Sequence, residues 1–121
     1  MGGKLMKAAL DIFNKVSEHL LTQNEKSLGE DEVCAYRNHT GLECAVGCLI
    51  DDEFYSEDLE YWNLDRNGIV SDALEKSGVD MTREILDLLQ RLQKLHDHTE
   101  PETWKEELEK VKIDFFGVKY A

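Results

Sequence analysis

The chain has 121 residues, of which 41% are hydrophobic, so it is the size of one domain with enough apolar material for a single core, and wholesale disorder is excluded. Its formal net charge is −12, because 26 acidic residues face 14 basic ones. Binding to nucleic-acid phosphates needs clustered Lys and Arg, and an anionic membrane repels a negatively charged protein, so the composition argues against direct contact with either. The acidity is consistent with solubility alone or with a surface that binds a basic protein partner.

The N-terminus and the cysteines predict a compartment. The stretch MGGKLMKAALDIF lacks the long apolar run of a signal peptide, and no segment approaches the ~20 apolar residues of a membrane span. Three cysteines form an odd set, which with the missing export signal predicts free thiols in a reducing cytoplasm.

The first predicted element is an amphipathic helix over about residues 4–23, because apolar residues recur there at helical spacing. They are Leu5, Ala9, Ile12, Phe13, Val16 and Leu20. A polar loop follows. Residues 33–37 are rich in β-formers, residues 38–41 (NHTG) have turn composition, and residues 42–44 can pair back, which predicts a small β-hairpin.

The next segment, CAVGCLI over residues 44–50, predicts a short buried helix, because Ala45, Gly47 and Cys48 allow another backbone to approach closely. An acidic stretch follows, with Phe54, Leu59 and Trp62 as its expected apolar anchors.

The C-terminal half predicts three further helices. The first covers residues 69–77 and ends at Gly78. The second is capped by Asp80 or Thr82 and carries an apolar stripe of Ile85, Leu88, Leu89, Leu92 and Leu95. The third begins at a capping box of Thr99 and Glu102, carries Trp104, Leu108 and Val111 on one face, and leads into an aromatic tail that docks. The expected fold is a mainly α (α+β) single domain over residues 1–121, with about five helices and one small hairpin.

Zinc is the first chemical candidate, because Cys44 and Cys48 are spaced to share a helix face, with Cys34 across the hairpin and His39 or His96 as a fourth ligand. Structural zinc sites use two ligand pairs around tight knuckles, and a second pair is missing here. The three cysteines are therefore interpreted as core residues, and no metal or cofactor is predicted.

A cysteine nucleophile is the second candidate, with Cys44 at a helix N-terminus and His39 or His96 as its base. No orienting third group or oxyanion site accompanies them, so we predict no enzyme, and a Cys44-based activity remains an alternative. The pair of histidines in His96-Asp97-His98 suggests a metal or phosphohydrolase site, but is interpreted as a partly buried histidine that closes a helix C-terminus.

Two binding sites are predicted. The first is an acidic run beside aromatic residues, a composition typical of a protein-binding surface. It consists of Asp51, Asp52, Glu53, Glu57, Asp58, Glu60, Tyr61 and Trp62. The alternative is a small-molecule site in which Tyr36, Arg37 and His39 contact a phosphate or nucleotide.

The stretch C-x-Y-R…G-x-x-C-A-V-G-C-L-I-D-D-E resembles a group of small uncharacterised phage and prophage proteins. The matching residues are Cys34, Tyr36, Arg37, Gly41, Cys44 to Ile50, and Gln93 to Asp97 in the less exact form LQKLHD. The resemblance implies a phage or bacterial cytoplasmic origin and no particular activity. Together with the charge, it leads to the expectation of a phage-type accessory protein that binds and inhibits a host protein of defence or nucleic-acid handling; the alternative is a nucleotide or small-molecule sponge.

Overall fold

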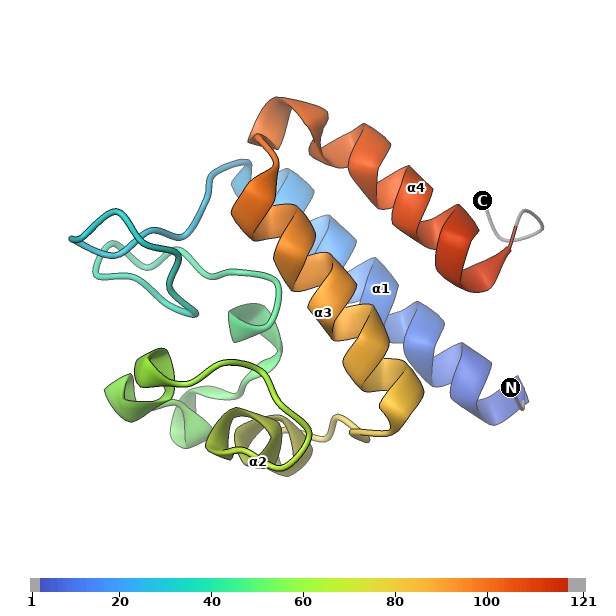
Figure 1. Ribbon diagram of the computed structural model, residues 1–121, viewed down its shortest axis with the longest axis horizontal. Helices are drawn as coiled ribbons and strands as arrows, with labels where there is room; N and C mark the ends of the chain where they lie inside the picture. Colours follow the sequence, from blue (N-terminus) through green and yellow to red (C-terminus); the bar gives the residue numbers. More distant parts are fainter. Residues whose placement is uncertain (1–2, 118–121) are drawn as a thin grey trace.

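The computed structural model describes residues 3–117, which are mainly helical (Figure 1). The α-helices are α1 (Gly3–Gln23), α2 (Ile69–Lys76), α3 (Arg83–His98) and α4 (Trp104–Phe116). Four short 3-10 turns are η1 (Gly47–Leu49), η2 (Asp52–Phe54), η3 (Glu57–Tyr61) and η4 (Pro101–Thr103). No helix in these residues is both long and apolar enough to cross a bilayer.

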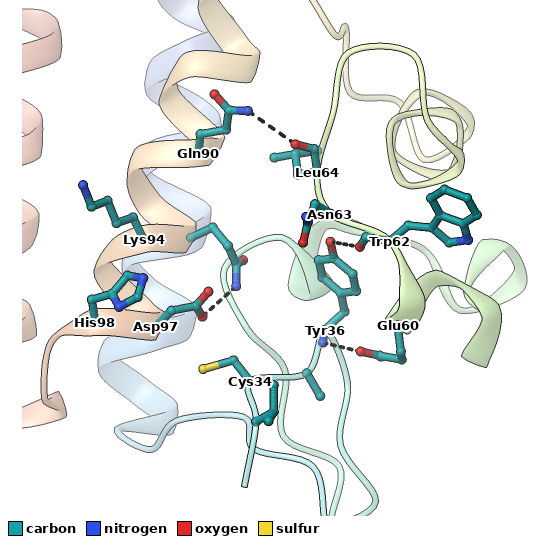
Figure 2. A pocket seen from close by; sticks show the side chains of 13 residues that line it. Cys34, Tyr36, Glu60, Trp62, Asn63, Leu64, Gln90, Lys94, Asp97 and His98 are labelled. Atoms are coloured by element: carbon teal, nitrogen blue, oxygen red, sulfur yellow. Dashed lines mark hydrogen bonds between the residues drawn. The ribbon is translucent and has the colours of Figure 1, made fainter. Parts of the chain in front are cut away.

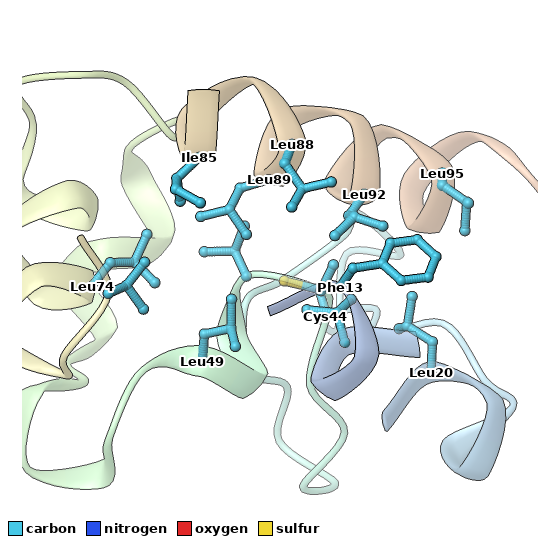
Figure 3. Close-up of a cluster of buried hydrophobic side chains, with 14 of the residues drawn as sticks. Phe13, Leu20, Cys44, Leu49, Leu74, Ile85, Leu88, Leu89, Leu92 and Leu95 are labelled. Atoms are coloured by element: carbon cyan, nitrogen blue, oxygen red, sulfur yellow. The ribbon is translucent and has the colours of Figure 1, made fainter. Parts of the chain in front are cut away.

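Helices α1, α3 and α4 pack against one another, and the long connection between α1 and α2 lies at one side of them (Figure 1). The core forms where the apolar faces of these helices meet one another, α2 and the segment around η1, and the entire predicted stripe of α3 is buried in it (Figure 3). Burying one such aliphatic side chain contributes about 1.5–3 kcal/mol, so this periodicity is the main source of the helical arrangement. Cys44 lies inside this cluster and is fully buried.

Four of the five predicted helices are confirmed, those that correspond to α1, α2, α3 and α4, and so are two of their ends. The Thr82 hydroxyl accepts a hydrogen bond from the Ile85 N–H at 3.2 Å and caps α3. Gly78 follows α2 with a φ of +95°, which favours glycine. On α4, Trp104 and Leu108 are buried. The side chain of Leu5 and residues 118–121 of the tail lie outside the described residues.

The predicted capping box before α4 is wrong. Thr99 is instead the C-cap residue of α3, and its hydroxyl donates to the Leu95 carbonyl at 2.6 Å. The turn η4 then intervenes, so α4 begins only at Trp104. The hydroxyl that could have capped α4 is used to close α3.

The predicted hairpin is also wrong, since residues 3–117 contain no strand. Only two isolated antiparallel bridges form, between Leu28 and Cys34 and between Arg37 and Glu43. The ladder does not extend because the N–H groups of Tyr36 and Arg37 donate to the Glu60 carboxylate rather than to a neighbouring strand. The expected helix over residues 44–50 is reduced to η1, so the described residues contain four α-helices instead of the five expected.

Candidate protein-binding surface and two adjoining hollows

The acidic segment of residues 51–60 folds into η2 and η3, which turn most of its carboxylates toward solvent. Its exposed acids, called the acidic surface below, are Asp51, Asp52, Glu53, Glu57 and Asp58. Leu59 is buried and anchors the segment to the core. The result is a dense patch of negative charge on a fixed backbone.

Glu60 differs from the other acids because its carboxylate is used inside the protein. It accepts from the N–H groups of Tyr36 at 2.9 Å and Arg37 at 3.1 Å, and from the Tyr55 hydroxyl at 2.6 Å. Burial and this carboxylate together raise the pKa of the Tyr55 hydroxyl. We therefore assign Glu60 a positioning role: it ties the acidic segment to residues 36 and 37.

Tyr61 and Trp62 follow directly and are the most exposed aromatic side chains described, with exposed fractions of 85% and 58%. The Trp62 backbone is nevertheless held, because its carbonyl accepts from the Tyr36 hydroxyl at 2.7 Å (Figure 2). Two large rings thus stand in solvent on an ordered backbone beside the acidic surface.

Arg37, from the alternative ligand site, is occupied by groups of the protein itself. Its Nη1 donates to Asp52 at 2.8 Å, its Nε lies 3.0 Å from a Glu43 oxygen, and its Nη2 donates to the Ile50 carbonyl. The guanidinium also lies 4.7 Å from the centroid of the Tyr55 ring. A phosphate would have to compete with two carboxylates for this guanidinium.

Of the other two residues of that alternative, only His39 lines the same hollow as Arg37, and Tyr36 does not. The Tyr36 hydroxyl donates to Trp62, and His39 is exposed. The contacts give a phosphate no assembled cradle of donors.

A first hollow of about 370 Å³ lies between residues 33–36, residues 60–64 and the C-terminal half of α3 (Figure 2). Its polar lining includes Glu60, Lys94, Asp97 and His98. Trp62 is one of its lining residues, so the hollow adjoins the exposed aromatic residues.

Asp97 is a centre of hydrogen bonding at this hollow. It accepts from the Gln93 amide at 3.0 Å, and it lies 2.8 Å from Nδ1 of His96. Burial by itself raises the pKa of the Asp97 carboxyl, but hydrogen bonds from His96 and its neighbours outweigh it and hold the pKa below its usual value. The same Gln93 accepts from the Val46 N–H at 3.0 Å, so this cluster fastens the irregular connection to α3.

Cys34, His96 and Asp97 present potential metal-ligand atoms within 4.8 Å of one another. The tautomer of His96 argues against a metal centre. Its Nε2 lies 2.9 Å from the Ser27 backbone N–H, which can only donate, so Nε2 accepts and Nδ1 carries the proton toward Asp97. A metal on Nδ1 would move that proton to Nε2, where it would face the Ser27 N–H. The cluster is thus best explained as a hydrogen-bonding network around the buried His96.

The thiols do not show the features of a nucleophile. Burial raises the pKa of Cys34 to about 11, with a further contribution from Asp97, and it raises the pKa of Cys48 to about 12. Burial also raises the pKa of Cys44, which is fully enclosed. All three are free thiols, and a protonated buried thiol is a poor attacking group.

A second hollow, of about 750 Å³, lies on the other side of residues 33–35. Four carboxylates line it, those of Glu30, Asp31, Glu57 and Glu60. Its remaining side chains include Val33, Arg37, His39, Tyr55 and Tyr61. Both hollows share Val33, Cys34, Ala35 and Glu60 in their lining, so a short piece of chain separates them.

Sequence reasoning missed the roles of Asp97 and Glu60 and the contribution of Glu30 and Asp31. For Asp97 a local signal existed, because Gln93 lies four residues before it on one helix face. Glu60 bonds to residues more than 20 positions away, and Glu30 and Asp31 share their hollow with the equally distant Glu57, so no local pattern in the sequence predicts these roles.

Comparison with protein-family models, curated proteins and solved structures finds no match for this chain. The function is therefore inferred from the surface itself.

Proposed function

We propose that this chain is a small accessory protein that binds a host protein with a basic surface and thereby inhibits it. The observation that carries the proposal is the pair of solvent-exposed rings, Tyr61 and Trp62, directly beside the five carboxylates of the acidic surface. Aromatic anchors near the centre of charged surroundings are a common composition of protein interfaces.

The aromatic rings and the carboxylates are expected to contribute to binding in different ways. The rings supply apolar area that is desolvated on binding, and Trp and Tyr are the residues most enriched among interface hot spots. The carboxylates supply complementarity and long-range attraction, which raises the association rate more than the final affinity. A basic groove that normally holds nucleic acid presents the matching charge, which is why we favour a host protein of defence or nucleic-acid handling.

The hydrogen bonds of Glu60 support the proposal because they organise the surface before binding. They fix the backbone that carries Tyr61 and Trp62 against residues 36 and 37. A surface that is already ordered loses less conformational entropy when a partner docks.

The test uses the immobilised protein to capture partners from a bacterial lysate, followed by binding kinetics with each captured protein. The surface variant is the triple reversal Asp51→Lys, Glu53→Lys and Asp58→Lys, which leaves the Arg37–Asp52 pair intact. The matched control reverses three exposed acids on and before α4, Glu102→Lys, Glu106→Lys and Glu109→Lys.

We expect both variants to fold, since exposed substitutions change stability by about 0.5 kcal/mol or less each. The surface variant should associate about tenfold more slowly or worse, and wild-type binding should weaken as salt rises, because charges are screened beyond roughly 10 Å at 0.1 M salt. Trp62→Ala should raise the dissociation rate. A captured protein that binds both triple variants equally well and ignores salt would contradict the proposal.

A further inference from the structure

The second hollow is anionic although it contains the only arginine of the predicted phosphate site. Four carboxylates line it, and the guanidinium of Arg37 is already paired with Glu43 and Asp52, which are outside that lining. The electrostatic sign of this hollow is therefore the reverse of what a phosphate or nucleotide requires.

The walls of the hollow suit a cation as well. Tyr55 and Tyr61 both contribute to the lining, and Tyr61 is 85% exposed. The face of a tyrosine ring attracts cations, and it favours guanidinium groups in particular because they are planar and weakly hydrated. Arg37 already occupies such a position over the Tyr55 ring, at 4.7 Å. The Tyr61 ring is available for a second cation from outside.

We propose that this hollow receives an arginine side chain of the partner protein, stacked on Tyr61 and paired with the carboxylates of Glu30, Asp31 and Glu57. This inference rests on the proposed function and adds the chemistry of the contact. The volume of about 750 Å³ is in the range of ligand pockets and exceeds what one side chain fills, so residues flanking the arginine enter with it. The exposed Val33, at the wall between the two hollows, offers them an apolar contact.

The test needs no identified partner, because a small probe can replace it. The probe is N-acetyl-arginine amide, and its neutral counterpart is N-acetyl-citrulline amide, which keeps the shape and loses the charge. Each is titrated into the isotopically labelled protein while backbone amide shifts are followed. We expect shifts at residues 29–39 and 55–61 that saturate with the arginine compound and are absent with the citrulline compound.

Two variants with the same change in charge locate the binding. The hollow variant is Glu30→Gln, Asp31→Asn and Glu57→Gln; the Asn oxygen can still accept from the Val33 N–H, as Asp31 does at 3.1 Å. The control variant is Asp51→Asn, Glu53→Gln and Asp58→Asn. We expect the hollow variant to bind the arginine probe about fivefold more weakly or worse, and the control variant to lose less than about twofold in affinity. The reason is that carboxylates beside the bound guanidinium attract it strongly, whereas more distant exposed carboxylates are screened by salt.

Three results would overturn the inference: equal shifts from both compounds, shifts centred on residues 51–53, or equal weakening by the two variants. None of these results bears on the capture experiment, which contradicts the proposed function only if no captured partner depends on the acidic surface. Conversely, arginine binding at the hollow without any captured partner would support this inference and count against the proposed function.

Discussion

Gly47 is the position where one added carbon is expected to do the most damage. A Cβ built on Gly47 would lie 1.9 Å from the carbonyl oxygen and 2.7 Å from the carbonyl carbon of Tyr36. Real Cβ contacts are essentially never under 3.0 Å, so Gly47→Ala forces one of two backbones to move by roughly 1 Å. Neither can yield by rotating a side chain, because the clash is with main-chain atoms.

The cost can be estimated from what that movement breaks. Overpacking a buried site typically costs about 1–3 kcal/mol. The Tyr36 carbonyl also accepts from the Cys44 N–H at 3.1 Å, and the Tyr36 N–H donates to Glu60. Each lost bond adds about 1 kcal/mol. We expect a loss of about 3–5 kcal/mol, which is a large part of the about 5–15 kcal/mol that stabilises a typical domain.

The measurement is urea and thermal unfolding followed by circular dichroism. At this size the loss corresponds to a fall in Tm of roughly 12–20 °C. Gly68→Ala is the control, because a Cβ there meets no atom closer than 3.9 Å, and we expect a cost within about 1 kcal/mol for a glycine at a helix N-cap. If the free energy of unfolding of the Gly47→Ala protein lies within about 1 kcal/mol of the wild-type value, residues 36 and 47 do not approach each other as closely as described.

Two further predictions concern the network at Asp97. Because the pKa of Asp97 is held below its usual value in the folded protein, the ionised carboxylate stabilises the fold above the unfolded pKa of about 3.9, and this contribution is lost as pH falls through the folded pKa. Asp97→Asn should therefore lower the free energy of unfolding by about 1–3 kcal/mol at pH 7, and the difference in Tm between wild type and variant should narrow below about pH 4. A difference in Tm that stays constant down to pH 3 would refute this. Cys34, with a pKa of about 11, should react with iodoacetamide about a hundredfold more slowly at pH 8 than an unperturbed thiol, and labelling at the rate of glutathione, followed by mass spectrometry, would contradict the burial that we describe.

The helices and most of the core could be predicted from the sequence alone. The stripe from Ile85 to Leu95 is buried as its spacing predicts, and Thr82 and Gly78 mark helix ends through short-range geometry. The small residues near Gly47 also predicted a close backbone approach, which proves to be that of Tyr36. All of these are local signals, since periodicity, capping and steric size act within a few residues of each other.

The outcome of residues 33–50 and the character of the hollows were decided only by the tertiary structure. A hairpin was a sound local prediction, but Glu60, more than 20 residues along the chain, takes the N–H groups of Tyr36 and Arg37. The tertiary structure also brings Glu57 and Glu60 to the hollow that Glu30 and Asp31 line, so that a region predicted to bind phosphate is anionic. Side chains of polar residues can reach any backbone that the fold carries past them, and a sequence read in order contains no periodic signal for such distant hydrogen bonds and charges.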